Sequence, residues 1–459
     1  MKALLLLSGL GVISLLAEIF NFKKPLLSIV LIGLFATLIV TVSDWDTSLY
    51  HFKMMYFDNY AVSFTALLIG IAFFWFLTAG DYLSNVVGIT DYFALILFAL
   101  CGAVVMVSYS NMVMLFIGIE ILSISSYVLA GSNKSDLASN EAAFKYFLMG
   151  SFATGFLLFG IALIYGVSGS FDLKTIADYT VSNTTDTPRL LYAGVLFLLV
   201  GLAFKVSVVP FHFWAPDVYQ GAPTMITSFM ATIVKTAAFA AFFRLFYICF
   251  PNLGEVWVEI IWVMAALTSL IGNITAVYQN SVKRMLAYSS ISHAGYMMLG
   301  LLAMNQTSAS ALLYYSGAYA FATITTFYIT YILIKNKGND DIDSFNGLSK
   351  TNPLMAVTML IALLSLAGIP PLAGFFAKYY IFTTALQSGY VGLVVIALLG
   401  SLIGVYYYFR IVIAMFFKGE GETPAMLHLN TTGKLLLIIL TLITIALGLF
   451  PAFIINLLT

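Results

Sequence analysis

Long apolar segments, separated by short polar connections, recur along the whole chain. A helix that crosses the hydrocarbon core of a bilayer needs about 20 predominantly apolar residues. Fourteen segments reach or approach that length: 3–20, 25–43, 61–79, 90–108, 111–130, 140–167, 190–209, 224–248, 256–278, 283–303, 308–335, 353–386, 389–417 and 433–458. The pattern therefore predicts an all-α integral membrane protein with about 14 transmembrane helices.

Composition supports the same class. Of 459 residues, 61% are hydrophobic and 9% are charged, whereas soluble domains carry about 25% charged residues. The 20 basic and 20 acidic residues balance, which argues against a nucleic-acid partner and leaves the lipid bilayer as the main surroundings. The two cysteines lie in apolar stretches and indicate neither disulfides nor a metal cluster. Because no connection is long enough for a cofactor-binding domain, we expect no cofactor in this chain.

The distribution of Lys and Arg between alternate loops predicts the orientation. The face that carries the termini collects five cations: Lys2, Lys53, Lys174, Arg189 and Arg244. The opposite face collects eleven: Lys23, Lys24, Lys134, Lys145, Lys283, Arg284, Lys335, Lys337, Lys350, Lys418 and Lys434. Cytoplasmic loops carry the excess of positive charge, so both termini are expected outside the cell.

An internal repeat appears at an offset of 169 residues, where segment 111–154 matches 280–323 without gaps. The identical pairs are Asn111/Asn280, Val113/Val282, Ser123/Ser292, Tyr127/Tyr296, Gly131/Gly300, Ser139/Ser308, Ala142/Ala311, Tyr146/Tyr315, Phe152/Phe321, Ala153/Ala322 and Thr154/Thr323. The alternative is chance similarity between apolar sequences. The copies lie five helices apart, an odd number, so they cross the membrane in opposite senses. This predicts two inverted five-helix repeats, helices 4–8 and 9–13, an arrangement typical of transporters.

Helix breakers support that pairing. Pro210 and Pro216 lie beside helix 7, and helix 12 contains Gly368, Pro370, Pro371 and Gly374. Interrupted backbone at membrane depth is tolerated where protein or water covers it. We therefore predict broken helices 7 and 12 and four parts: an N-terminal three-helix segment at 1–88, a first half-channel at 89–250, a second at 251–418 and a C-terminal helix at 419–459.

Five ionisable residues that lie deep within the predicted spans, away from the span ends, form the candidate site: Glu120, Lys205, Lys235, His293 and Lys378. A charge at the bilayer centre costs about 2.5–3.5 kcal/mol even on lenient scales. Burial disfavours the charged form of a lysine and a nearby carboxylate favours it, so a lysine between these influences can exchange a proton. The alternative is a fixed ion pair of Glu120 with Lys205 or Lys235. For His293, a neutral packing role is an equal alternative.

Three further cations, Lys145, Arg244 and Arg410, lie near the ends of predicted spans. Long basic side chains at such positions commonly extend to the interface and keep their charge in water. We expect that behaviour here rather than a role in transport.

Three motifs resemble one family closely: residues 201–224 (GLAFKVSVVPFHFWAPDVYQGAPT), 282–293 (VKRMLAYSSISH) and 366–375 (LAGIPPLAGF). They resemble the antiporter-like membrane subunits of respiratory complex I. The similarity to that family extends over nearly the whole chain. The resemblance implies that Glu120 modulates Lys205, that Lys235 connects the two halves, and that Lys378 is the terminal lysine of the second half-channel. It also implies other membrane-arm subunits as partners, no direct NADH binding, and redox chemistry in other subunits. Lys205 and Lys378 are 173 residues apart rather than 169, so they are not strictly equivalent.

The expected function is proton translocation along these residues and water, coupled to quinone reduction elsewhere in an NADH:quinone oxidoreductase of a bacterial plasma membrane. One alternative is a cation/proton antiporter subunit of the multisubunit sodium type. The other is a structural membrane spacer whose buried ions only fix packing.

Overall fold

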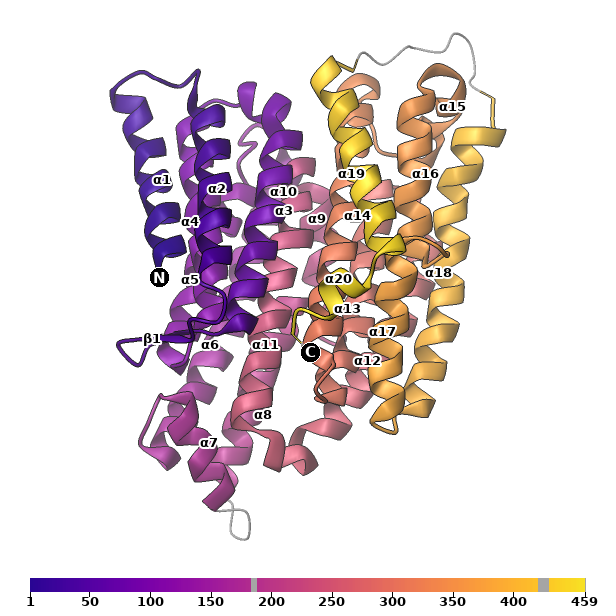
Figure 1. Cartoon of the computed structure of the whole chain (residues 1–459). Helices are drawn as coiled ribbons and strands as arrows, with labels where there is room; N and C mark the ends of the chain where they lie inside the picture. The colour runs from indigo at the N-terminus through magenta and orange to yellow at the C-terminus, as the bar shows by residue number, and fades with distance from the viewer. Residues whose placement is uncertain (183–187, 420–428, 459) are drawn as a thin grey trace.

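All fourteen predicted spans are helical in the computed structural model, which describes residues 1–182, 188–419 and 429–458. The long helices stand side by side in one bundle (Figure 1). They are α1 (Lys2–Ile19), α2 (Leu26–Ser43), α3 (Asn59–Ser84), α4 (Ile89–Ser108), α5 (Met112–Ala130), α6 (Leu137–Ser168), α8 (Arg189–Val206), α11 (Lys235–Cys249), α12 (Gly254–Val277), α13 (Val282–Ala303), α14 (Ser308–Lys337), α16 (Pro353–Ala367), α17 (Ala373–Gln387), α18 (Val391–Phe417) and α19 (Thr431–Leu449).

Shorter elements connect the long helices or continue them. A two-stranded hairpin joins α2 to α3, and α10 with the π-helix η1 runs directly into α11. The short elements are β1 (Leu49–His51), β2 (Met55–Phe57), α7 (Leu173–Ser182), α9 (Trp214–Gly221), α10 (Thr224–Phe229), η1 (Met230–Val234), η2 (Pro251–Leu253), η3 (Ile342–Phe345), α15 (Leu348–Thr351) and α20 (Ala452–Ile455).

Twelve helical segments of the described residues are long and apolar enough to cross a membrane. The two other predicted spans differ for separate reasons. Helix α13 is long enough but polar, with Ser289, Ser290, Ser292 and His293 in one stretch, and residues 289–302 are all buried. A helix that faces protein rather than lipid need not be apolar. The span at 353–386 is divided into α16 and α17, of 15 residues each.

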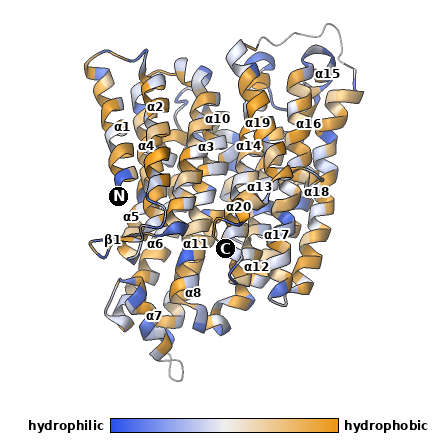
Figure 2. Ribbon diagram, in the orientation of Figure 1, coloured by the Kyte–Doolittle hydropathy of each residue, from blue (hydrophilic) through white to orange (hydrophobic). Residues whose placement is uncertain are grey.

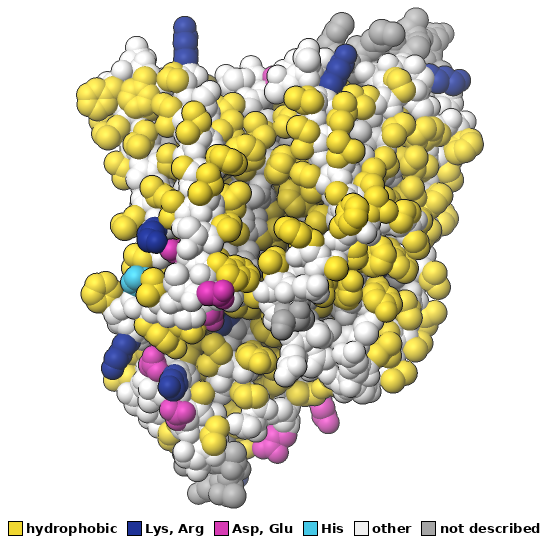
Figure 3. All heavy atoms as spheres, viewed as in Figure 1, with side chains coloured by type: hydrophobic (Ala, Val, Ile, Leu, Met, Phe, Trp, Pro, Cys, Tyr) yellow, Lys and Arg dark blue, Asp and Glu magenta, His cyan; other side chains and the backbone are white. Residues whose placement is uncertain are grey.

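The surface of the bundle is that of a membrane protein. Hydrophobic residues cover much of the long helices, and polar residues are concentrated in the connections between them (Figure 2). In the view of Figure 3, a few Lys and Arg side chains lie along the upper edge, and most of the other charged side chains lie over the lower half, with a broad hydrophobic zone between the two groups. This distribution matches a bilayer around the middle of the bundle.

Both copies of the predicted inverted repeat contain a similar backbone bridge at the start of a long helix. In the first copy, an isolated bridge pairs Asn111, the N-cap of α5, with Asp172. In the second, a similar bridge pairs Ser281, the N-cap of α13, with Asp341; Asp341 is equivalent to Asp172, whereas Ser281 is one residue after the equivalent of Asn111. The next α-helix after each bridge, α7 in the first copy and α15 in the second, lies at the opposite end of the bundle from the other (Figure 1). The two copies therefore run in opposite senses.

Both predicted helix breaks are present. Helix 7 consists of α8 and α9, and Ser207 at the break has φ +62°. Helix 12 consists of α16 and α17, and Gly368 at the break has φ +86°. Lys205 precedes its break and Lys378 follows its break, which explains why the two lysines do not obey the repeat offset.

The expectation that the charged group of Arg244 reaches water is wrong. Its side chain is 3% exposed and turns inward. It forms an ion pair with Asp58 at 3.0 Å and donates hydrogen bonds to the carbonyls of Tyr109, Val107 and Tyr56. Arg244 thus fixes the hairpin to α11, because its fixed fork of donors matches several acceptors at once.

The four-part division at 1–88, 89–250, 251–418 and 419–459 stays a prediction. Residues 420–428 and 459 of the last part lie outside the described residues.

Candidate functional site

Lys205 lies in the last turn of α8 and is buried. Its Nζ donates a hydrogen bond of 2.7 Å to Ser123 Oγ on α5 and lies 5.7 Å from the centre of the Tyr146 ring on α6. A cavity of about 10 Å³ adjoins it, lined partly by Tyr127 and Thr154. That volume is close to what one water molecule needs. The amine is therefore held by neutral groups beside a space for water.

Glu120 lies one turn of α5 before Ser123 and is half-buried. Its Oε1 is buried and accepts no hydrogen bond from the protein. Ion pairs of the described residues, defined by an N–O distance of at most 4.0 Å, do not include one between Glu120 and either Lys205 or Lys235. The described residues therefore show no direct pair of this carboxylate with either lysine.

Lys235 begins α11, directly after the π-helical turn η1. Residues 224–246 are buried throughout, so the amine lies in the most enclosed helix of the bundle. Its Nζ donates to the backbone carbonyl of Ser290 at 2.6 Å and to the hydroxyl of the same serine. Both acceptors belong to α13, in the second repeat.

His293 follows Ser290 on α13 and is also buried. Its Nδ1 lies 2.6 Å from the Tyr315 hydroxyl on α14, and its Nε2 lies 3.2 Å from the Tyr408 hydroxyl on α18. The Tyr408 hydroxyl also contacts Ser289 Oγ. Both ring nitrogens thus join one continuous row of hydroxyl groups.

Lys378 lies on α17, and the break in helix 12 holds its amine. Its Nζ donates to the carbonyl of Ala367, the last residue of α16, at 2.7 Å and to Ser401 Oγ at 2.7 Å. The Ala367 carbonyl is free to accept because the helix ends there. The amine also lies 5.3 Å from the centre of the Tyr296 ring on α13.

Helix α13 brings three of the five predicted residues together: it holds Lys235 at Ser290, carries His293, and lies against Lys378 through Tyr296. Glu120 and Lys205 form a separate group around α5 in the first repeat. No hydrogen bond among the described residues joins the two groups directly. In the described part of the chain, none of the three lysines has a carboxylate within 4.0 Å.

The neutral groups that surround the lysines were not among the residues predicted from the sequence. Ser123, Tyr127 and Tyr146 enclose Lys205, whereas Tyr296 and Tyr315 adjoin Lys378 and His293. All five belong to identical pairs of the internal repeat. These identities could have indicated the polar surroundings of the lysines, because most of the apolar positions around them differ between the two copies of the repeat.

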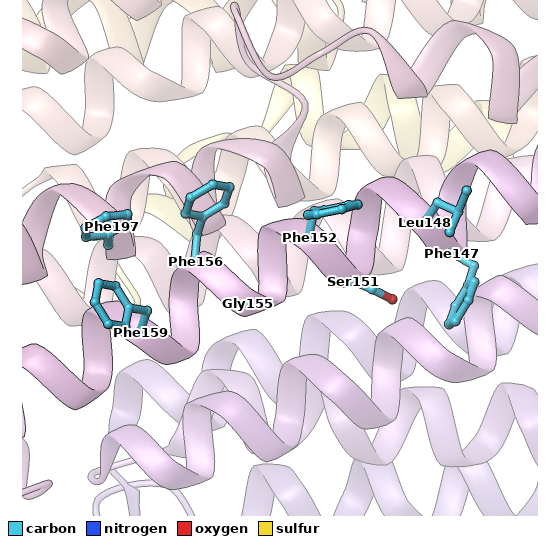
Figure 4. Close-up of a pocket in the computed structure, with 8 residues that line it drawn as sticks. All are labelled: Phe147, Leu148, Ser151, Phe152, Gly155, Phe156, Phe159 and Phe197. Carbon is cyan, nitrogen blue, oxygen red and sulfur yellow. The ribbon is translucent and has the colours of Figure 1, made fainter.

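Other features do not suggest a different site. A groove of about 630 Å³ lies along the surface of α6 and α8, lined by Phe147, Leu148, Ser151, Phe152, Gly155, Phe156, Phe159 and Phe197 (Figure 4). None of the five predicted residues lines it. No group of three or more His, Cys, Asp or Glu in the described residues has a geometry that would hold a metal ion.

The comparison with protein families decides the affiliation. The model described as NADH:quinone oxidoreductase/Mrp antiporter, transmembrane, matches residues 108–404. The chain belongs to this family. Its matched region contains all five predicted site residues and both broken helices.

Relatives within the NADH:quinone oxidoreductase/Mrp antiporter family extend the match to the whole chain. NADH-quinone oxidoreductase subunit N of Cytophaga hutchinsonii is 45% identical over 453 residues, 98% of each chain. The subunit N of Flavobacterium psychrophilum is 45% identical over 461 residues, 100% of each chain. The resemblance to antiporter-like subunits, drawn from three motifs, is thereby confirmed.

Solved structures of the family share the fold. A chain of respiratory complex I from Thermus thermophilus is 32% identical, with a TM-score of 0.83 over 99% of this chain and 98% of that chain. A chain of the Mrp complex from Dietzia is 20% identical, with a TM-score of 0.86 over 99% and 95%. The Mrp likeness shows a common fold, and the curated relatives lie on the complex I side of the family.

Proposed function

We propose that this chain is a proton-translocating membrane subunit of an NADH:quinone oxidoreductase. One observation carries the proposal: Lys205, Lys235 and Lys378 are buried amines that bond to hydroxyl and carbonyl oxygens and have no carboxylate partner within the described residues. Burying an ammonium without a counter-ion costs several kcal/mol. Selection for packing alone would favour an apolar residue, so proton exchange explains three such lysines better.

The proposed route has two halves. Protons enter from the predicted cytoplasmic face towards Lys205 and reach Lys235 through ordered water. Along α13, Ser290 and His293 then offer groups that both accept and donate protons, as serine hydroxyls and imidazoles do. His293 takes a proton at one ring nitrogen and releases one from the other, between the Tyr408 and Tyr315 hydroxyls. Lys378 is the last amine of the route.

Glu120 is the proposed modulator. A carboxylate that approaches an amine stabilises its charged form, and withdrawal favours release of the proton. Its unsatisfied Oε1 and half-buried position leave Glu120 free to change its distance from Lys205.

The proposed assignment makes the chain a non-redox subunit of a translocating enzyme. Other membrane-arm subunits of complex I are its proposed partners, and NADH oxidation and quinone reduction belong to other chains. Neither a cofactor nor bound NADH is expected here. The proposed location is a bacterial plasma membrane with both termini outside, on the distribution of Lys and Arg.

Replacing Lys205 or Lys378 with methionine tests the proposal in the complete complex, reconstituted in proteoliposomes. Each variant keeps the length of the side chain and removes the exchangeable proton. We expect NADH:quinone turnover and proton pumping to fall together by about tenfold or more, as if about 1.4 kcal/mol or more were lost from the transition state. The assembled amount of the complex should not change.

The same measurements separate the alternatives. Normal pumping in both variants would refute the proposal. Sodium-dependent proton exchange without NADH would instead indicate the sodium-type antiporter. Loss of assembly without a change in turnover per assembled complex would indicate a structural spacer.

A further inference from the structure

The second segment of broken helix 7, α9, lies between the two groups of the site. At its first residue, the Trp214 ring stacks on Tyr146 with centroids 4.6 Å apart and planes 7° apart. Trp214 Nε1 also donates to the Phe204 carbonyl at 3.0 Å, next to Lys205. Since Tyr146 lies against the Lys205 amine, one end of α9 is packed onto the surroundings of the first lysine.

Asp217, one turn later, connects α9 to two other helices. Its Oδ2 accepts a hydrogen bond of 2.7 Å from Lys145 on α6, and its Oδ1 accepts one of 2.9 Å from Arg284 on α13. Lys145 precedes Tyr146 in sequence. A single carboxylate is therefore shared between a cation of the first repeat and a cation of the second.

The first turn of α13 holds α9 at two further points. Arg284 Nη1 also donates to Gln220 Oε1 at 2.9 Å. Lys283 Nζ, which is buried, donates to the carbonyl of Ala222, the residue that follows α9, at 2.7 Å. A movement of α9 must therefore pull on α13 or break these contacts.

Helix α13 extends the connection to the second group. Ser290, which holds Lys235, lies six residues after Arg284, about 9 Å along the helix axis at 1.5 Å per residue. A helix transmits such a displacement as a rigid element. The contacts thus run without a gap from Lys205 through Tyr146, Trp214 and Asp217 to α13.

The ion pairs of Asp217 with Lys145 and Arg284 are weak enough to break and re-form repeatedly. The side chains of Lys145, Asp217 and Arg284 are 38%, 35% and 31% exposed. Ion pairs with this access to solvent contribute at most about 1 kcal/mol each. They are too weak to be needed for folding, yet couplings between sites in proteins are commonly of that size.

We propose that Asp217 is a positioning residue of the proton route: its carboxylate, shared between Lys145 and Arg284, couples the surroundings of Lys205 to helix α13, which binds Lys235 through Ser290 and carries His293. This inference rests on the proposed function. In the described residues, no hydrogen bond joins the group of Glu120 and Lys205 directly to the group of Lys235, His293 and Lys378. The inference assigns the connection between these two groups to α9.

The test uses Asp217→Asn in the reconstituted complex, which removes the charge and keeps the shape. We expect kcat for NADH:quinone turnover to fall about fivefold or more, with unchanged assembly and unchanged KM for quinone. Asp217→Glu should restore most of the loss. The double variant Asp217→Asn/Arg284→Gln should be no slower than the slower single variant, because both changes remove one connection.

A matched control is Asp343→Asn, which removes a more exposed pair with Lys418 from the loop beside the start of α13. It should leave turnover unchanged. If Asp217→Asn does not assemble, Lys145→Gln and Arg284→Gln each leave the carboxylate with one partner, and both should lower kcat.

Normal turnover in Asp217→Asn, or in both single-partner variants, would overturn the inference, as would losses that add in the double variant. The proposed function fails separately, through normal pumping in Lys205→Met. An inactive Lys205→Met beside a fully active Asp217→Asn would reject only the role of Asp217.

Discussion

Replacing Lys235 with methionine is expected to abolish turnover and proton pumping while leaving the complex at least as stable to heat as before. Lys235 is 2% exposed, and both acceptors of its amine belong to Ser290. Methionine of similar length removes a desolvated amine whose charged form costs several kcal/mol to bury. The lost hydrogen bonds cost about 1 kcal/mol each, so the two effects offset each other or favour the variant.

Thermal melting of the purified complex and proton uptake by proteoliposomes are the two measurements. Lys434→Met is the matched control, because that lysine is exposed at the start of α19; it should change neither quantity. A structural role for Lys235 predicts the opposite combination. If Lys235→Met melts at a lower temperature and its assembled fraction pumps normally, the amine serves packing and the relay lacks its central member.

Much of the fold could be predicted because hydropathy acts over long segments. About 20 apolar residues in a row have few ways to be covered other than by lipid or by other helices. The two breaks were predictable for a related reason, since Pro210 and Pro371 cannot continue a helix undisturbed. The burial of the three lysines inside the bundle was predictable from their place within the spans.

The partners of the lysines could not be predicted in the same way. Ser123, Ser290 and Ser401 each lie on a different helix from the amine they bind. Serine is common in these helices, and hydropathy does not define how each helix is rotated about its axis. Only the packed bundle decides which hydroxyl meets which amine.

The burial of Arg244 also could not be predicted from its position in the sequence. Its position near a span end predicts contact with water, but Asp58 and the carbonyls of Tyr109 and Tyr56 lie where they can bind it. Those acceptors come from segments more than 130 residues earlier in the chain. Long-range pairing of this kind leaves no local pattern in the sequence.

The second large effect is expected from Gly374→Ala, at the break of helix 12. A Cβ built on Gly374 would lie 1.7 Å from the carbonyl oxygen of Ser365 on α16 and 2.6 Å from its carbonyl carbon. These are backbone atoms, so no side-chain rotation relieves the overlap. Overpacking usually costs 1–3 kcal/mol; because α16 and α17 must separate here, we expect about 3 kcal/mol or more and a lower yield of assembled complex.

The separation should also reach the site. Lys378 lies one helical turn after Gly374, and its amine bonds to the carbonyl of Ala367 across the same gap. Complex that still assembles with Gly374→Ala should therefore turn over slowly, as measured by NADH oxidation per assembled complex. The matched control is Gly392→Ala on α18, where a Cβ meets no atom within 4 Å, and it should be neutral. Normal stability and turnover in Gly374→Ala would mean that the backbone of α16 at Ser365 does not lie against Gly374 of α17. In that case the Ala367 carbonyl would not hold the Lys378 amine.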